Sequence, residues 1–224
     1  MLNNRKTIFS NSTNDIDRLI DSLDQKHALQ RKCQFLLDIR GYIKENKIFG
    51  NYVEFGSYLS RTSYIASKIF PEINIIQCDL FDQNNTTKLI TYKQDEPFIN
   101  HTNDYFKVSL KDIQQFQTKF NGKGVVIDGD FRDISVQKQI LKEGPYSICI
   151  LDCNFLSSIE AALETFINAA SPGAVIFFDD YFLNLKKGNP LIGEMLKKFK
   201  NFNFYEHGFY APFGKSFILG STDL

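Results

Sequence analysis

The sequence contains no tryptophan, only four cysteines in 224 residues, and no excess of either sign of charge. Basic and acidic residues number 26 each, so no overall positive charge draws the chain to nucleic acid or to a membrane surface. The cysteines form neither a C-x-x-C pair nor the dense framework of a small disulfide-bonded protein. We therefore expect reduced, buried thiols and no nucleic-acid partner.

Long apolar runs and targeting signals are also missing. The longest apolar stretches, such as Ala174–Phe178, fall far short of the ~20 residues that a membrane-spanning helix needs. The first residues are polar and lack the basic-then-apolar order of a signal peptide. These features favour a cytoplasmic protein with no membrane association. They leave the oligomeric state open, a homo-oligomer included.

What the sequence does contain is a regular alternation of short apolar runs and amphipathic segments. Continuous apolar runs typical of strands buried on both faces lie at 52–56, 73–78, 125–127, 146–151 and 174–178. Helical patterns separate them, and residues 202–209 and 216–219 have the alternation of a closing β-hairpin. The sequence therefore predicts an α/β, Rossmann-like fold: a mostly parallel seven-stranded sheet with helices on both faces and a C-terminal β-hairpin.

A separate segment precedes these strands. Residues 1–14 are polar, and from 15 to about 46 apolar residues recur at helical spacing, which predicts one or two amphipathic helices. We expect an N-terminal arm and helical cap over 1–48 and a ligand-binding domain over 49–224. The polar stretch 82–104 has no clear pattern, and we expect it, with the N-terminal helices, to fold over a substrate.

Acidic residues follow all five predicted parallel strands. The carboxyl ends of parallel strands lie along one edge of the sheet, where open α/β folds bind ligands, so these side chains should converge on one crevice. A single aspartate in such a place is more often a helix N-cap, but five strand ends in succession are hard to explain by capping alone. The residues are Glu54, Asp79, Asp128 with Asp130, Asp152, and the pair Asp179-Asp180.

The adjacent Asp179 and Asp180 are the most informative of these acids. Two carboxylates at the end of a buried strand repel each other unless a positive charge lies beside them. A divalent cation is the simplest source of that charge. The sequence therefore predicts a metal ion at this edge of the sheet.

Gly56 ends the first strand and leads toward a helix. Glycine there lets the backbone approach a ligand closely. The dinucleotide fingerprint G-x-G-x-x-G is absent, since the run is Gly56-Ser-Tyr-Leu-Ser60. This disfavours a classical NAD site and suits a ligand that joins a nucleoside to an amino-acid tail without phosphate.

Taken together, the strand-end motifs resemble the class I S-adenosylmethionine-dependent methyltransferases, and in particular the macrocin O-methyltransferase family. The likeness spans about residues 50–185, with motifs in the same order. It is carried by Glu54-Phe-Gly56, Gly129-Asp-Phe-Arg-Asp133, Leu151-Asp-Cys-Asn-Phe-Leu-Ser-Ser158, Pro172-Gly173 and Asp179-Asp-Tyr181. The resemblance implies S-adenosylmethionine as cofactor and O-methylation of a small-molecule hydroxyl, on a sugar or a glycosylated metabolite.

The resemblance also implies a magnesium ion held by Asp152, Asp179 and Asp180. Oxygen-only ligands suit Mg²⁺. The chain departs from the family at Ser60, where a glycine is usual, and at Asn154, where a second aspartate is usual, with Phe155-Leu156 in place of Leu-Tyr. These changes leave the three proposed ligands intact, and Asn154 points to a different substrate.

Roles for the remaining site residues follow from the same likeness. Asp152 is the candidate to take the acceptor's proton while touching the metal. Gly56, Ser57 and Tyr58 would lie beside the methionine part of the cofactor, with Glu54 supporting its ammonium group. Asp79 would bind the ribose hydroxyls, and Asp130 and Phe131 would meet the adenine. For Phe131, plain core packing is an equal alternative.

Other interpretations remain open. The three histidines, His27, His101 and His207, are expected to have surface or packing roles rather than catalytic ones. The rival functions are an NAD- or nucleotide-binding Rossmann enzyme, a catalytically inactive S-adenosylmethionine-binding module, and a metal-free methyltransferase. Binding of S-adenosylhomocysteine against NAD separates the first, turnover the second, and sensitivity to EDTA the third.

Overall fold

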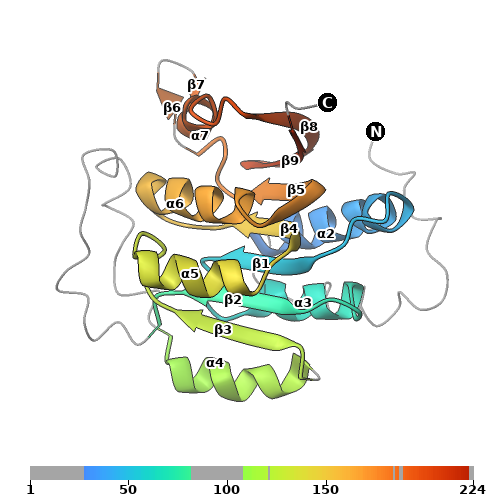
Figure 1. The fold of residues 1–224 in the computed structure, drawn as a ribbon, viewed down its shortest axis with the longest axis vertical. Coiled ribbons are helices and arrows are strands. Elements are labelled where there is room, and N and C mark those ends of the chain that lie inside the picture. The colour runs from blue at the N-terminus through green and yellow to red at the C-terminus, as the bar shows by residue number, and fades with distance from the viewer. Residues whose placement is uncertain (1–27, 82–107, 121, 184, 187–188, 222–224) are drawn as a thin grey trace.

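The computed structural model describes residues 28–81, 108–120, 122–183, 185–186 and 189–221 (Figure 1). Predictions for the N-terminal arm, for His27 and His101, and for the stretch 82–104 lie outside the described residues. Where the structure is described, no helix combines the length and the apolar character needed to cross a membrane.

A seven-stranded sheet forms the centre of the molecule (Figure 1), with strand order β3-β2-β1-β4-β5-β9-β8. The first five strands in chain order are parallel, and the last two form an antiparallel hairpin beside β5. The strands are β1 (Asn51–Phe55), β2 (Ile75–Asp79), β3 (Gly124–Asp128), β4 (Tyr146–Leu151), β5 (Ala170–Phe178), β8 (Phe202–Tyr210) and β9 (Gly214–Ser221), with a separate two-stranded ribbon of β6 (Leu185–Lys186) and β7 (Asn189–Pro190).

Helices pack on both faces of the sheet. Buried side chains of α5, α6 and α7 belong to one core cluster and those of α2 and α3 to another. The described helices are α2 (Ala28–Glu45), α3 (Arg61–Ile69), α4 (Leu110–Gln117) with the short 3₁₀ turn Thr118–Phe120, α5 (Ile134–Lys142), α6 (Leu156–Ile167) and α7 (Leu191–Leu196). The predicted Rossmann-like fold with its C-terminal hairpin is confirmed.

The parallel strands are mostly apolar because their side chains alternate between the cores on the two faces of the sheet. Successive side chains of a strand point to opposite faces. Val53 and Phe55 therefore pack in the core cluster of α5 and α6, while Tyr52 packs in the core cluster of α2 and α3. The same alternation directs Glu54, which follows the parity of Tyr52, toward α2 and α3. This parity decides which helices can reach the acidic strand ends.

One strand begins several residues earlier than the sequence predicts. The apolar run at 174–178 predicts a strand from 174, but α6 ends at Ile167 and β5 already begins at Ala170. The pairing of β4 with β5 shifts register between Tyr146 and Ile148, so Pro172 and Gly173 lie where the ladder is interrupted. Proline is tolerated at such an irregularity because no ladder hydrogen bond is required of it.

Helix α2 belongs to the main core and not to a separate layer. Its buried side chains, among them Phe35 and Leu36, share a cluster with β1, β4 and β5, and the Phe35 ring stacks on Phe177 at 4.8 Å between centroids. This packing holds α2 across the sheet close to the strand ends. The N-terminal segment thereby contributes to the crevice described next.

Candidate active site

A crevice opens where the order of the strands reverses. The chain leaves β1 toward β2 on one side, and β4 lies on the other side of β1, so the carboxyl ends of β1 and β4 flank the switch point at which open α/β sheets bind ligands. A cavity of about 560 Å³ occupies this place. Four carboxylates and three cationic side chains line it: Glu54, Asp152, Asp179 and Asp180, with Arg31, Lys32 and Arg61.

The end of the neighbouring strand β4 leaves space only for a glycine at position 56. Its φ is +84°, and a Cβ atom there would lie 2.0 Å from the carbonyl oxygen of Asp152. The amide of Asp152 donates to the Phe55 carbonyl at 2.9 Å, which keeps the two tips together. The sequence predicts that Gly56 allows close approach to a ligand. Gly56 does line the cavity, but the close approach that demands a glycine is to Asp152.

The residues after Gly56 include a buried hydroxyl. Ser57 lines the cavity, is 5% exposed, and its Oγ has no hydrogen-bond partner among the residues that the structure describes. A buried hydroxyl without a partner carries a desolvation cost that a bound ligand can relieve. Tyr58 also lines the cavity, in a left-handed conformation with a φ of +44°. These residues suit a polar ligand in the crevice.

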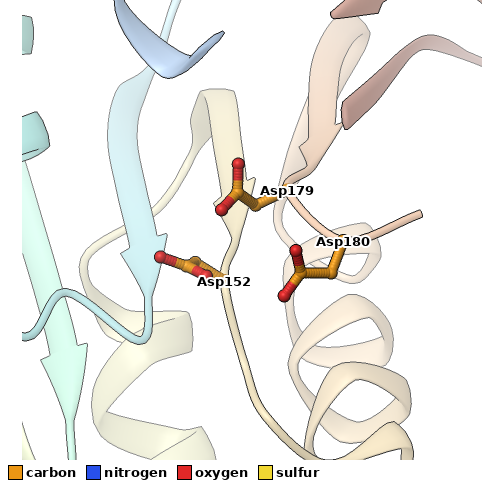
Figure 2. Close-up of side chains that lie close together, drawn as sticks. All are labelled: Asp152, Asp179 and Asp180. Carbon is orange, nitrogen blue, oxygen red and sulfur yellow. The ribbon is translucent and has the colours of Figure 1, made fainter. Parts of the chain in front are cut away.

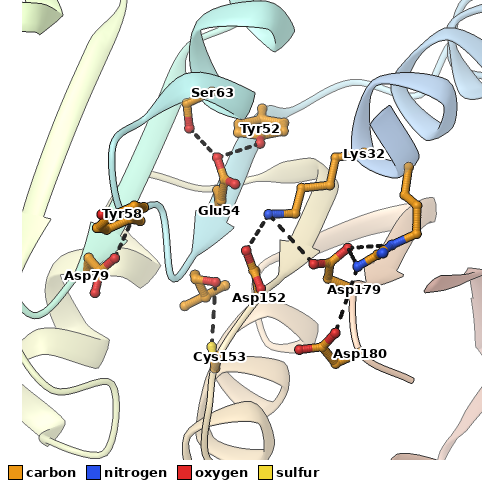
Figure 3. Close-up of polar contacts among 12 residues, drawn as sticks. Lys32, Tyr52, Glu54, Tyr58, Ser63, Asp79, Asp152, Cys153, Asp179 and Asp180 are labelled. Atoms are coloured by element: carbon orange, nitrogen blue, oxygen red, sulfur yellow. Dashed lines mark hydrogen bonds and ion pairs between the residues drawn. The ribbon is translucent and has the colours of Figure 1, made fainter. Parts of the chain in front are cut away.

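Glu54 lies on the floor of the cavity and is almost fully buried. Its Oε2 accepts hydrogen bonds from the Tyr52 hydroxyl at 2.9 Å and the Ser63 hydroxyl at 2.5 Å (Figure 3). Burial raises the pKa of Glu54 to about 7, against the opposing effects of Lys32 and these hydroxyls. A cationic ligand group would stabilise the charged form of a carboxyl buried in this way.

Asp79 ends β2 and anchors the turn after Gly56. Its Oδ2 accepts from the Tyr58 amide at 2.6 Å (Figure 3). Its Oδ1 accepts from the Leu80 amide at 2.7 Å. Burial raises the pKa of Asp79 to about 6, although both amide hydrogen bonds oppose the rise. Asp79 is not among the residues lining the 560 Å³ cavity. Its predicted role toward a ribose stays a prediction, beside the structural role seen here.

Asp130 and Phe131, predicted to meet an adenine, also stand outside that cavity. The Asp130 carboxylate holds the side chain of Arg132, with Oδ2 2.6 Å from Nη2, and these hydrogen bonds lower the pKa of Asp130 despite partial burial. The Phe131 ring packs edge-on against Phe55 at 5.3 Å between centroids. The packing alternative for Phe131 is therefore present in the structure, and its contact with a ligand stays a prediction.

Three carboxylates predicted to come together do so. Asp152 follows β4, and Asp179 and Asp180 follow β5, and each offers an oxygen within 4.8 Å of the others (Figure 2). The Asp179 amide donates to the Leu151 carbonyl at 3.1 Å, which brings the two strand ends into contact. The donor chemistry of this cluster suits Mg²⁺.

Two cationic side chains of α2 already contact the same carboxylates (Figure 3). The Lys32 ammonium pairs with Asp152 Oδ2 and lies 3.9 Å from Asp179 Oδ2. The Arg31 guanidinium donates to Asp179 Oδ1 from Nε at 3.1 Å and from Nη2 at 2.9 Å, and Nη2 lies 3.8 Å from Asp180 Oδ1. As arranged, the acids do not fit a metal ion unless Lys32 moves away.

The charges of this cluster are mutually dependent. Burial alone would lower the pKa of Lys32, but Asp152 and Asp179 outweigh burial and hold that pKa above its ordinary value. Burial and Asp152 raise the pKa of Asp179, while Lys32 and Arg31 act in the opposite direction. The cations of α2 thus favour the charged form of a carboxyl that is only 3% exposed.

Arg31 and Lys32 were not predicted as site residues, although the sequence contains a signal for Lys32. Apolar residues at 29, 36, 39 and 43 mark the buried face of α2, and Lys32 completes their three-and-four spacing. A lysine on the apolar face of a helix needs a buried anionic partner. The residues that the prediction placed at the strand ends supply that partner.

His207 stands in β8, away from this cluster. Its Nδ1 lies 3.0 Å from the Ser216 hydroxyl and its ring packs 6.1 Å from that of Tyr42. Burial lowers its pKa. His207 therefore has the packing role that the sequence favours.

Comparison with known proteins identifies similar folds but assigns the chain to no family. No family model matches the chain, and no curated protein matches it. Among solved structures it is similar to the O-methyltransferase NovP, with a TM-score of 0.69, 14% identity, and coverage of 93% of this chain and 99% of that one. For the calicheamicin methyltransferase CalS11 the corresponding values are 0.57, 13%, 94% and 94%.

A third similar structure was solved with a bound ligand. The methyltransferase PaMTH1 of Podospora anserina, bound to SAH, has a TM-score of 0.50 and 11% identity, with coverage of 97% of this chain and 99% of that one. At these identities the likeness establishes a shared fold. The chain therefore has the Rossmann-like architecture of these methyltransferases over nearly its whole length.

Proposed function

We propose that this chain is an S-adenosylmethionine-dependent O-methyltransferase acting on the hydroxyl of a small molecule. The observation that carries the proposal is the crevice at the switch point. There an acidic floor at Glu54 and an unpartnered Ser57 hydroxyl meet the carboxylate of Asp152. The fold shared with NovP, CalS11 and PaMTH1 supports the same activity.

The residues of the crevice fit this cofactor better than a dinucleotide. S-adenosylmethionine carries a positive sulfonium and an amino-acid tail, and four carboxyl groups line the cavity. The loop after β1 lacks the glycines that receive a pyrophosphate. We assign the amino-acid tail to Glu54, Gly56, Ser57 and Tyr58, where the Ser57 hydroxyl is available for a hydrogen bond.

When bound, S-adenosylmethionine supplies a methyl group that is already activated for transfer. The protein then has to orient the acceptor hydroxyl in line with the methyl–sulfur bond and accept its proton. We assign the second task to Asp152, whose side chain is 28% exposed at the cavity and whose Oδ2 is held by Lys32. With S-adenosylmethionine bound, the cofactor would supply the methyl group to the acceptor oxygen, and the Asp152 carboxylate would accept the proton that this hydroxyl loses.

The proposed acceptor is a sugar or a glycosylated metabolite. CalS11 is described as a TDP-rhamnose 3'-O-methyltransferase, which supports a sugar hydroxyl as the target. Asn154 lines the cavity two residues after Asp152, and its amide can both donate to and accept from a hydroxyl. We therefore assign Asn154 to acceptor binding.

Magnesium assistance, with Asp152, Asp179 and Asp180 as ligands, stays a prediction. The three oxygens suit the ion, which would stabilise an acceptor oxygen as it loses its proton. Its position competes with Lys32, as described above. No step of the proposed reaction depends on it.

Calorimetry followed by turnover tests the proposal. We expect S-adenosylhomocysteine to bind with one-to-one stoichiometry and NAD not to bind, and Asp152→Asn to keep that binding while losing methyl transfer from labelled cofactor to a panel of nucleotide sugars. The reverse ligand preference would favour a nucleotide-dependent Rossmann enzyme. Cofactor binding with no transfer to any hydroxyl of the panel would favour an inactive binding module.

A further inference from the structure

The positive charge demanded by the acidic strand ends comes from helix α2. Three carboxylates, those of Asp152, Asp179 and Asp180, face the ammonium of Lys32 and the guanidinium of Arg31 in one connected set of ion pairs. Adjacent carboxylates repel each other, and this repulsion led to the prediction of a divalent ion. Two resident cations already oppose that repulsion.

Lys32 cannot easily vacate this position for a metal ion. The residue is 6% exposed and lies on the face of α2 that also carries buried Leu29, Cys33 and Leu36. That face packs in the core against the sheet, and although Lys32 borders the cavity, its side chain is only 7% exposed. Moving it away from its carboxylates would leave a buried charge unpaired, which is strongly unfavourable.

A divalent ion bound beside Lys32 would meet a like charge at close range. Lys32 pairs with Asp152 Oδ2 and approaches Asp179 Oδ2, so the ammonium faces two of the three proposed ligand residues. In a partly desolvated site such repulsion is far stronger than in water. Arg31 adds a second positive charge on Asp179.

We propose that Lys32 takes the place of a divalent cation in this site, so that the enzyme works without a metal. The inference rests on the proposed methyltransferase function. Lys32 acts as a positioning residue, since its own side chain is 7% exposed while that of Asp152 is 28% exposed. By holding Oδ2, the ammonium directs the remaining oxygen of Asp152 toward the cavity and keeps the strand ends together without Mg²⁺.

Magnesium titration of the protein saturated with S-adenosylhomocysteine tests this inference. We expect Lys32→Met to bind Mg²⁺ at least tenfold more tightly than the wild-type chain by calorimetry, because the substitution removes the competing charge and leaves the carboxylates. Lys44→Met makes the same substitution at an exposed position of the same helix and should leave Mg²⁺ affinity as in the wild type. Far-UV circular dichroism checks folding, and Lys32→Gln replaces Lys32→Met if the latter does not fold.

The ratio of the two affinities decides the outcome. Equal Mg²⁺ affinity in the wild type and the Lys32 variant, whether both bind or neither does, overturns the inference, as does wild-type turnover that EDTA abolishes and Mg²⁺ restores. Wild-type turnover that is unchanged in EDTA supports it. Failure of S-adenosylhomocysteine to bind the wild-type chain would instead refute the proposed function, and it is seen before any magnesium is added.

Discussion

The two halves of the crevice are built on different physical principles. On the β1–β2 side, the turn after Gly56 is determined by backbone geometry: a positive φ, a 2.0 Å contact that only glycine avoids, and amide hydrogen bonds to Asp79. On the β4–β5 side, the strand ends are determined by charge, with three carboxylates paired to two cations of α2. The first half leaves a hydroxyl free for a ligand, whereas the second satisfies its charges internally.

The two halves should therefore respond differently to substitution. In the β1–β2 half, adding a single methyl group is strongly destabilising, because there is no space for it. In the β4–β5 half, the loss of stability on removing a partner increases with burial, because an unpaired ion is most unfavourable where water cannot reach it. Substitutions can therefore separate a cofactor half that depends on shape from an acidic half that depends on partners.

The largest effect is expected at the glycine of the first half. Gly56→Ala combines a strained φ with a Cβ 2.0 Å from the Asp152 carbonyl oxygen, so we expect the free energy of unfolding to fall by about 3 kcal/mol or more. Urea denaturation measures the loss. Gly122→Ala is the matched control, since its φ is +77° but nothing lies within 4 Å of the added Cβ, and it should cost about 1 kcal/mol. Equal losses in both variants would show that the contact with Asp152 is unimportant.

The charge-paired half is probed by removing a cation. Arg31→Met leaves Asp179, which is 3% exposed, without its guanidinium partner, and we expect a loss of about 3 kcal/mol near neutral pH. Arg40→Met, at an exposed position of the same helix, should change stability by about 0.5 kcal/mol or less. Thermal and urea unfolding compare the two. A loss at Arg31 no larger than that at Arg40 would mean that Asp179 does not depend on this pair.

Glu54 lies between the halves and makes stability depend on pH. Its pKa is raised by burial to about 7, so the folded state holds a proton that the unfolded state releases above its ordinary pKa near 4.5. Stability from this group should therefore decrease as pH rises from about 5 to 7, by at most about 1.4 kcal/mol per pH unit. Glu54→Gln keeps an acceptor for Tyr52 and Ser63 and should remove this slope in urea unfolding measured across that range. An unchanged slope would assign it to other groups.

The smallest effect is expected at the free hydroxyl. Ser57→Ala removes an Oγ that has no partner within the described part of the chain, so stability should not fall, while affinity for S-adenosylhomocysteine should drop about fivefold, equivalent to roughly 1 kcal/mol for one hydrogen bond. Ser60→Ala is the control, because its buried Oγ is also unpartnered but the residue does not line the cavity. Calorimetry with both variants tests whether the first half binds the cofactor through Ser57.

Several features of the site were accessible from local pattern. The strand β4 was predicted with its observed bounds, and the convergence of Asp152 with Asp179 and Asp180 followed from the rule that parallel strands end on one edge. Such rules work because strand direction and side-chain alternation are local properties. The contacts of Asp130 and Phe131 are harder to predict from local pattern. The pairing of Asp130 with Arg132 and the packing of Phe131 on Phe55 depend on loop geometry.

The parallel sheet, its closing hairpin and the acidic edge could be predicted from the residues alone, since apolar periodicity and strand-end residues report on structure only a few positions away. What neutralises that edge depends on tertiary packing. The partners of Asp152 and Asp179 lie 120 and 148 residues earlier in the chain, on a helix whose position depends on packing across the whole sheet. Long-range ion pairs of this kind leave no periodic signal, because they join side chains through the fold and not along the chain.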